Sequence, residues 1–465
     1  MNNRFWCFED IDKERIALIN ELNEPVTYQQ LDDAIEIFIK ALPKYQVLVF
    51  LKVKNTYKSI VGYLACLRSN NPFLLIDSKI EEALLLDLID TYSPSYLLEE
   101  LNLKQLNEGG YAFHSDVAML LSTSGSTGTP KLVKLSYENI TSNTRAIVEY
   151  LGIRENDCMI TTLPMSYSYG LSLINTHLHV GGCIVINEYS FFEPKFWDKI
   201  KTYNVATLAG VPFSYQMLKR LDYSRFDTSS IRYLTQAGGK LDATTLCYFY
   251  QQCEALGQQF IVMYGQTEAS PRISYLPAEV GKDKLNSIGV AIPNGRLFLT
   301  DSEGIEINTP FIEGELTYTG PNVMLGYAKG SIDLQTGDEQ NGLLATGDLG
   351  YFDEDGFFYI TGRTKRFIKL FGLRISLDRI DSWLLKHNIK AMTVGRDDLL
   401  VICYESTTEK LANETRKKVA STFKISIKSI KVVFIDEVPR INAGKVDYKR
   451  LNSLVFKCTN PPLQN

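Results

Sequence analysis

The chain has 465 residues, of which 45% are hydrophobic and 22% charged, and its formal net charge is −5. This length exceeds one compact core, so we expect two or three domains of an ordinary globular protein. The acidic balance argues against broad nucleic-acid binding, which requires a basic surface that displaces counterions from phosphates. No apolar signal core and no run of roughly 18 apolar residues occurs, so we expect a cytoplasmic protein without a membrane span.

In chain order, predicted strands and helices alternate through the first part of the sequence. Residues 26–42 carry apolar side chains at helical spacing, with Thr27 as a candidate N-cap. A strand at 45–53, a helix at 57–70 and a strand at 72–77 are predicted next. The same alternation recurs several times further along the chain. It predicts βαβ units and a parallel sheet.

The pattern changes near Gly281, where short strands bounded by glycine predict antiparallel β structure. The last ~100 residues predict a helix, a hairpin that turns at 396–398, a second helix and a strand, which suffice for a small domain. We therefore predict an α/β fold. A large N-terminal domain, 1–364, would hold βαβ-type parallel sheets and a β-rich subdomain, and a small α+β domain would span 365–465.

The eight cysteines and the pair His177 and His179 give no clear metal or disulfide signal. The closest cysteines in sequence are Cys247 and Cys253, and no C-x-x-C pair occurs. In a reducing compartment such cysteines are most simply buried apolar residues. The two histidines lack an evident third ligand, so we interpret them as a satisfied, partly buried pair.

A hydroxyl- and glycine-rich stretch, T-S-G-S-T-G, follows a predicted apolar strand. Glycines let the backbone turn its N–H groups toward one point, and hydroxyl groups add donors. Ligands of parallel α/β sheets lie beyond strand ends of this kind. The stretch does not match the Walker A pattern, but its chemistry indicates phosphate binding. A flexible polar surface loop is the alternative, because loops rich in Ser, Thr and Gly are common. The candidate phosphate ligands are Thr123, Ser124, Gly125, Ser126, Thr127, Gly128 and Lys131.

The stretch L-L-S-T-S-G-S-T-G-T-P-K resembles the phosphate-binding loop of the AMP-forming adenylating enzymes. This superfamily includes acyl- and aryl-CoA synthetases, peptide-synthetase adenylation domains and firefly-type luciferases. Further family motifs are matched in order at 236–241 (Q-A-G-G-K-L), 264–270 (Y-G-Q-T-E-A-S), 346–363 (T-G-D to G-R) and 439–445 (P-R-I-N-A-G-K). The first 120 residues match only in general pattern. Leu132 departs from the family, which usually has a glycine after the loop lysine.

The resemblance implies an enzyme that joins a carboxylate to ATP as an acyl-adenylate, releases pyrophosphate and transfers the acyl group to a thiol. It implies that Glu268 binds Mg²⁺ and that Thr267 contacts the α-phosphate. It implies ribose binding by Asp348 with Arg363 nearby, and a catalytic Lys445 that bridges the carboxylate and the α-phosphate. The further ATP or AMP contacts that it implies are Gly238, Gly239, Lys240, Tyr264, Gly265 and Gln266.

The resemblance also implies that the small C-terminal domain is mobile. After adenylation it would swing about a hinge at Lys365 and withdraw Lys445 from the active site. The face near Gly372 would then approach for thioester formation. A hinge needs only a few residues that tolerate a backbone change, and a surface lysine is the alternative for Lys365.

The stretch L-P-M-S-Y-S-Y-G-L-S-L resembles the family's acid-binding segment. Members that activate amino acids usually carry an Asp there, whereas no acidic residue occurs between Leu163 and Leu178. We therefore expect a carboxylic acid without an α-ammonium group, aromatic or aliphatic. Plain core packing is the alternative for these candidate pocket residues, which are Tyr169, Gly170, Ser172, Val211, Ala237 and Gly265.

The acceptor thiol is CoA or the phosphopantetheine arm of a carrier protein, since both end in the same group. We see no obvious basic cluster for the CoA 3′-phosphate, although R-K-K occurs at 416–418. The first prediction is an acid–CoA ligase. The alternatives are a stand-alone adenylation enzyme that loads an acyl or aminoacyl group onto a separate carrier, and a non-catalytic nucleotide-binding relative.

Overall fold

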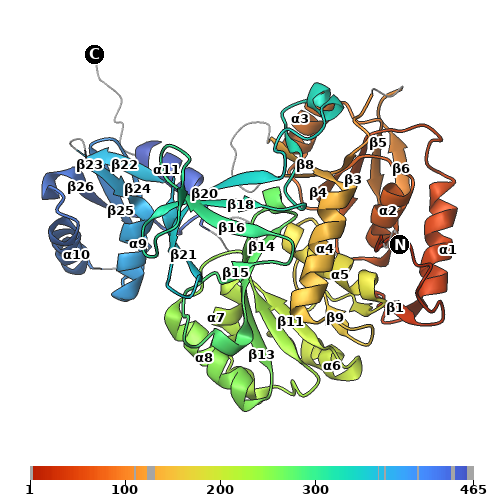
Figure 1. The fold of residues 1–465 in the computed structure, drawn as a ribbon, viewed down its shortest axis with the longest axis horizontal. Coiled ribbons are helices and arrows are strands. Elements are labelled where there is room, and N and C mark those ends of the chain that lie inside the picture. The colour runs from red at the N-terminus through yellow and green to blue at the C-terminus, as the bar shows by residue number, and fades with distance from the viewer. Residues whose placement is uncertain are drawn as a thin grey trace. The chain divides into compact units, whose positions relative to one another are not determined.

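The computed structural model describes residues 4–108, 112–122, 131–364, 366–370, 373–405, 408–440 and 446–457. The chain forms two compact units (Figure 1). Unit 1 comprises residues 1–297 and 318–344, and unit 2 comprises residues 298–317 and 345–465. The domain boundary at residue 365 stays a prediction. Within the described ranges, no helix has the length and apolar character needed to cross a membrane.

Unit 1 contains a nine-stranded sheet. In spatial order its strands are β15 (Val290–Ala291), β14 (Arg272–Leu276), β13 (Gln259–Gly265), β12 (Tyr233–Gln236), β11 (Thr207–Gly210), β9 (Cys158–Ile160), β10 (Cys183–Val185), β1 (Ile16–Ile19) and β2 (Pro25–Thr27). Every pairing from β13 across to β1 is parallel, which confirms the predicted parallel sheet. Parallel strands end at one edge, so the loops after β11, β12 and β13 lie side by side.

A seven-stranded sheet is the second sheet of unit 1. In spatial order its strands are β19 (Gly326–Ala328), β8 (Leu132–Ser136), β7 (Val117–Ser122), β4 (Phe73–Asp77), β3 (Val49–Val53), β5 (Tyr96–Glu99) and β6 (Asn102–Gln105). β7 and β8 pair antiparallel, with Ser122 opposite Leu132. We did not predict β8 from the sequence. All five of its residues are buried, so it lacks the polar–apolar alternation of a half-buried strand.

N-cap side chains that the sequence encodes stand at the start of the helices α1 (Tyr28–Ile39), α2 (Tyr57–Arg68), α4 (Tyr137–Leu151) and α8 (Ala243–Ala255) of unit 1. Thr27 Oγ1 accepts a hydrogen bond from the Gln30 N–H, and the Gln30 side chain accepts one from the Thr27 N–H, so the predicted N-cap is confirmed. Ser136 and Asn139 form the same reciprocal pair before the helix that follows β8. The other helices are α3 (Glu82–Tyr92), α5 (Ser168–Val180), α6 (Pro194–Thr202) and α7 (Pro212–Arg220), with short 3₁₀ helices η1 (Tyr223–Arg225), η2 (Thr267–Ala269), η3 (Ala278–Val280) and η4 (Ser331–Gln335).

An aromatic core supports the nine-stranded sheet. Tyr215 packs edge-on against Phe249 and Phe260, and the latter two rings are stacked with centroids 5.5 Å apart. The Tyr215 hydroxyl donates a hydrogen bond to the Thr235 carbonyl at 2.6 Å. These contacts hold β11, β12 and β13 firmly, and the predicted nucleotide residues follow the ends of these strands.

His177 lies in the last turn of α5 and is fully buried. Its Nδ1 donates a hydrogen bond to the Leu173 carbonyl at 2.9 Å, whereas Nε2 has no partner among the described residues. The interpretation as a satisfied, partly buried pair is therefore wrong for His177, because α5 is buried on all sides over most of its length. His179 is partly buried as expected, and its Nδ1 has no partner among the described residues. Burial lowers the pKa of His177 to about 4.

This shift predicts acid destabilisation. Between pH ~6.5 and ~4 the unfolded chain binds a proton at His177 that the folded chain does not, so the free energy of unfolding falls as the pH falls. At pH 5 we expect a loss of about 2 kcal/mol from this group. The His177→Gln variant keeps a donor for Leu173 but cannot titrate. Urea unfolding at pH 7.5 and 5 should show a smaller pH difference in the variant, and equal differences in both proteins would contradict the prediction.

Unit 2 holds most of a five-stranded sheet and a smaller α+β part. The sheet, in spatial order, comprises β17 (Glu306–Ile307), β16 (Arg296–Thr300), β18 (Gly314–Thr319), β20 (Leu343–Phe352) and β21 (Phe358–Arg363). The α+β part comprises the hairpin β22 (Phe367–Leu370) and β23 (Leu373–Ser376), the strands β24 (Ala391–Arg396), β25 (Leu399–Tyr404) and β26 (Ile430–Phe434), the helices α9 (Leu377–Lys386), α10 (Glu409–Thr422) and α11 (Tyr448–Lys457), and η5 (Ile427–Ser429). Arg396 pairs with Leu399, so the predicted hairpin turn is confirmed.

Candidate active site

Several predicted site residues lie outside the described residues: the phosphate-loop residues 123–128, Lys365, Gly372 and Lys445. Their roles stay predictions. The described residues that flank residues 441–445 are held together in unit 2. Arg440 and Val446 form an antiparallel bridge, and the Asp447 N–H donates a hydrogen bond to the Pro439 carbonyl at 2.8 Å. The described residues on either side of 441–445 therefore lie next to each other in unit 2.

Tyr327 links the loop lysine to the predicted metal ligand. β19 pairs antiparallel with β8 and places Tyr327 opposite Val133. Lys131 lies two residues before Val133, and its Nζ lies 3.3 Å from the centroid of the Tyr327 ring. The Tyr327 hydroxyl donates a hydrogen bond to Glu268 Oε1 at 2.7 Å. Burial and the Glu268 carboxylate raise the pKa of Tyr327, so the hydroxyl stays protonated and remains a donor.

The turn that carries Thr267 and Glu268 is fixed by residues 322–324. The Met324 N–H donates a hydrogen bond to the Glu268 carbonyl at 2.9 Å. The Asn322 side-chain amide donates to the carbonyls of Ala269 at 2.6 Å and Arg272 at 2.8 Å. The backbone around Glu268 therefore keeps one position, and both Thr267 and Glu268 are half-buried at the end of β13.

The predicted adenine turn follows β12, beside the end of β13. Gly238 has φ +87°, and a Cβ there would lie 2.7 Å from the Tyr167 hydroxyl oxygen, so the turn requires glycine. Gln236 Nε2 donates a hydrogen bond to the Gly239 carbonyl at 2.9 Å and stabilises the turn. Gly239 and Lys240 are exposed. Tyr264, Gly265 and Gln266 end the neighbouring parallel strand and are half-buried, so both predicted nucleotide segments share one sheet edge.

The acid-binding segment forms the start of α5. The Tyr169 hydroxyl donates a hydrogen bond to the Thr235 carbonyl at 2.9 Å, and the Ser172 hydroxyl donates to the Tyr169 carbonyl at 2.7 Å. A Cβ at Gly170 would lie 2.2 Å from the Pro164 carbonyl oxygen, so only glycine allows this close approach. Val211 and Ala237 are buried, like the three α5 residues. The pocket roles of these residues stay predictions.

In unit 2, the predicted ribose residues form an ion pair across a hairpin. Asp348 on β20 lies opposite Arg363 on β21, and Arg363 Nε donates a hydrogen bond to Asp348 Oδ1 at 3.0 Å. Asp348 is largely buried, whereas Arg363 is exposed. The Asp348 N–H also donates to Thr346 Oγ1 at 3.1 Å. The T-G-D and G-R motifs are 15 residues apart in sequence, and the strand register brings them together.

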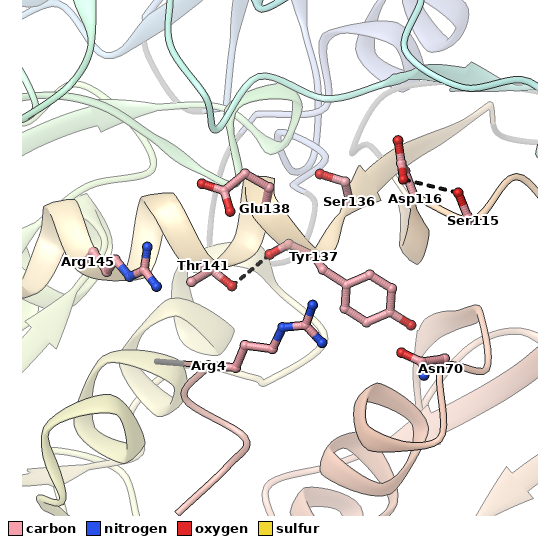
Figure 2. A pocket seen from close by; sticks show the side chains of 9 residues that line it. All are labelled: Arg4, Asn70, Ser115, Asp116, Ser136, Tyr137, Glu138, Thr141 and Arg145. Atoms are coloured by element: carbon pink, nitrogen blue, oxygen red, sulfur yellow. Dashed lines mark hydrogen bonds between the residues drawn. The ribbon is translucent and has the colours of Figure 1, made fainter. Parts of the chain in front are cut away.

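A cavity of about 410 Å³ opens at the N-terminal end of α4, away from the predicted site residues (Figure 2). Figure 2 shows the Arg4 side chain directed toward Tyr137, and its guanidinium carbon lies 5.7 Å from the centroid of that ring. Two acidic and two basic side chains line the cavity, so its charge favours no one ligand. The lining residues are Arg4, Asn70, Ser115, Asp116, Ser136, Tyr137, Glu138, Thr141 and Arg145.

Tyr327 and Asn322 were not predicted from the sequence, although the stretch P-N-V-M-L-G-Y that contains both lies between two recognised motifs. No local pattern marks them as site residues. The pairing of β19 with β8 brings Tyr327 to Lys131, about 200 residues earlier in the chain. The one sequence signal that could have pointed to these two residues is the position of their stretch between two recognised motifs.

The sequence is similar to a known enzyme family and to named relatives. The model of the AMP-binding enzyme family matches residues 107–328. The chain is 30% identical over 395 residues to the probable 4-coumarate–CoA ligase 2 of Dictyostelium discoideum, which covers 81% of this chain and 67% of the relative. It is 31% identical over 349 residues to the 2-succinylbenzoate–CoA ligase of Bacillus cereus (strain AH820), which covers 72% of this chain and 70% of the relative.

A solved structure shows the same fold. The o-succinylbenzoate CoA synthetase of Bacillus subtilis, in complex with the acyl-adenylate intermediate OSB-AMP, aligns with a TM-score of 0.79 at 24% identity. The alignment covers 96% of this chain and 98% of that one. At this identity the likeness concerns the fold, and it extends over both units.

Proposed function

This chain belongs to the AMP-forming adenylating enzymes, and on that premise we propose that it is an ATP-dependent acid–CoA ligase. A carboxylic acid and ATP form an acyl-adenylate and pyrophosphate, and the CoA thiol then displaces AMP. The names of the two curated relatives, both CoA ligases, support CoA as the acceptor. The main support for the proposal is that Lys131 and Glu268 both contact Tyr327. These contacts place a cation close to the carboxylate that we propose as the metal ligand.

The described residues fit a magnesium ion that is held mainly by the nucleotide. Mg²⁺ in such sites takes one or two protein carboxylates and completes its shell with phosphate oxygens and water. Glu268 supplies one carboxylate, and no three His, Cys, Asp or Glu residues gather into a metal site in the described part of the chain. When bound, Mg²⁺ neutralises phosphate charge. Glu268 would hold it, with Thr267 beside the α-phosphate and Lys131 beside the outer phosphates.

Other residues of the chain would orient the two reactants. Asp348 would accept hydrogen bonds from the ribose hydroxyls, since Arg363 already orients its carboxylate. Tyr264 would stack on adenine beside the Gly238 turn. Lys445 would bridge the substrate carboxylate and the α-phosphate, where negative charge must be stabilised as pyrophosphate leaves.

The decisive experiment is acid-dependent exchange of labelled pyrophosphate into ATP, across aryl, short-chain, long-chain and amino acids. It requires no thiol and therefore isolates adenylation. We expect exchange with one class of carboxylic acid that lacks an α-ammonium group. A second arm compares AMP release with CoA and with a carrier protein. AMP release that requires the carrier, with CoA inert, would favour the alternative of a carrier-loading enzyme.

Tyr327→Phe tests how Glu268 is held. The variant keeps the ring beside Lys131 and removes only the hydroxyl that bonds Glu268. We expect the Mg²⁺ concentration for half-maximal ATP binding to rise about tenfold, the effect of losing one hydrogen bond to a charged group. Calorimetric titration of ATP at a series of Mg²⁺ concentrations measures this directly.

A matched control is Tyr92→Phe. The Tyr92 hydroxyl donates to the Ala328 carbonyl at 2.8 Å, so this change also removes a tyrosine hydroxyl that bonds β19. It leaves Glu268 and Lys131 untouched, and we expect unchanged Mg²⁺ dependence. An equal rise in both variants would show that Tyr327 acts only through the position of β19.

A further inference from the structure

Arg272, the first residue of β14, is a buried cation in unit 1 that is 2% exposed. Its guanidinium carbon lies 4.8 Å from the centroid of the Tyr169 ring, and its Nε has no hydrogen-bond partner among the residues that the structure describes. The Tyr150 hydroxyl is near enough to interact electrostatically with the guanidinium, and it donates a hydrogen bond to Met263 Sδ at 3.0 Å. Burial raises the pKa of Tyr150 to about 12, so this neighbour is neutral at physiological pH. The Arg272 guanidinium therefore has neutral aromatic side chains as neighbours.

No carboxylate forms an ion pair with Arg272 in the described part of the chain. The remaining residues include no aspartate or glutamate, so they cannot supply a side-chain carboxylate. Burying a charge without a partner is strongly unfavourable, and buried charges in folded proteins are normally paired. An unpaired buried guanidinium therefore suggests that its partner comes from a ligand.

Lys134 and the largely buried Arg366 pair with carboxylates, whereas the buried Lys199 donates a hydrogen bond from Nζ to the Ile186 carbonyl at 2.9 Å. The fully buried Lys134 pairs with Glu339 at 3.1 Å and also bonds backbone carbonyls. Arg366 pairs with Asp378 and Asp381 and donates to the Thr393 carbonyl. Lys134 and Arg366 each have a carboxylate from the chain itself. Arg272 Nε has neither a carboxylate nor a carbonyl partner among the described residues, and this difference from Lys134, Lys199 and Arg366 argues against a purely structural role.

Arg272 lies among residues that the sequence places around the substrate acid. Its ring contact, Tyr169, belongs to the acid-binding segment at the start of α5. Tyr167, in the same segment, packs edge-on against Tyr169 at 6.3 Å, and its hydroxyl approaches the Gly238 turn. Arg272 also follows Glu268 by four residues along the Asn322-clamped turn. These contacts connect the guanidinium to both the acid segment and the nucleotide segment of unit 1.

We propose that the substrate is a dicarboxylic acid whose second carboxylate pairs with the Arg272 guanidinium. The inference rests on the proposed acid-activating function and names its substrate class. A guanidinium has a planar fork of donors that matches a carboxylate, and its unused Nε–H is one of them. The first carboxylate is adenylated, and the second stays ionised and orients the acid. The missing acidic residue between 163 and 178 fits the same charge pattern, since this segment has no partner for a substrate cation.

The test uses pairs of acids that differ in one charge. Malonate, succinate, glutarate and phthalate are compared with their monomethyl esters in acid-dependent pyrophosphate exchange by the full-length enzyme. We expect at least one dicarboxylate to exceed its ester by 30-fold or more in kcat/KM. Arg272→Met should lower kcat/KM for that dicarboxylate by about 100-fold and leave the ester unchanged. ATP binding by the variant, measured by calorimetry, should equal that of the wild type.

A second variant shows whether the effect of Arg272→Met comes from the lost guanidinium or from misfolding. Arg272→Lys keeps a cation but not the planar fork, and we expect a raised KM for the dicarboxylate with kcat less affected. If monocarboxylic acids and esters exchange as well as dicarboxylates, and Arg272→Met does not change that ratio, the dicarboxylate proposal is wrong while the adenylating function stands. No exchange with any acid, despite ATP binding, would instead contradict the proposed function itself.

Discussion

Replacing Lys445 by alanine is expected to lower acyl-adenylate formation by about 10²–10³-fold, while the thioester step from supplied acyl-adenylate stays nearly unchanged. The reason is charge. In the first step two anions, the carboxylate and the α-phosphate, must approach each other, and one ammonium group placed between them stabilises the transition state. In the second step the thiol attacks an uncharged acyl carbon, and no such bridge is required.

Two assays separate the half-reactions. Pyrophosphate exchange reports adenylation, and release of AMP from chemically prepared acyl-adenylate with CoA reports thioester formation. Lys449→Ala is the matched control, because Lys449 is an exposed lysine of α11 just beyond the same segment. An equal fall in both half-reactions for Lys445→Ala would contradict the assignment of Lys445 to adenylation and the predicted swing of the small domain about Lys365.

Glu268→Gln is expected to lower pyrophosphate exchange about 100-fold, or ~3 kcal/mol of transition-state stabilisation. Glutamine keeps the size of the side chain and can still accept the hydrogen bond from Tyr327, so the turn should remain folded. It removes the negative charge that binds Mg²⁺. The loss should therefore be largest at low Mg²⁺ and partly recover as Mg²⁺ is raised.

The readout is the Mg²⁺ dependence of both exchange and calorimetric ATP binding. Glu279→Gln serves as the control, since Glu279 is an exposed acid on η3 of the same unit. We expect this control to behave as the wild type. A Glu268→Gln variant with unchanged Mg²⁺ dependence would exclude Glu268 as the metal ligand, whatever its effect on the rate.

Much of the architecture could be predicted from local sequence. The Thr27 cap, the start of α4 after Ser136 and the hairpin turn at 396–398 depend on residues within four positions of each other, and all three are present. The parallel sheet follows from the alternation of elements. β8 was missed because the burial of every residue removes the periodic signal, and burial is a property of the whole fold.

For the candidate site, too, some features could be predicted from local sequence and others only from the tertiary structure. The sequence by itself determined the family and the predicted residues of catalysis, because the motifs are contiguous stretches whose chemistry can be read directly. Only the tertiary structure decided which of them touch. Tyr327 meets Lys131 and Glu268 through strand pairing, and Arg272 is buried against Tyr169 with no acidic partner in the described ranges. Such contacts join residues far apart in the chain, and their energies depend on burial, which no single segment encodes.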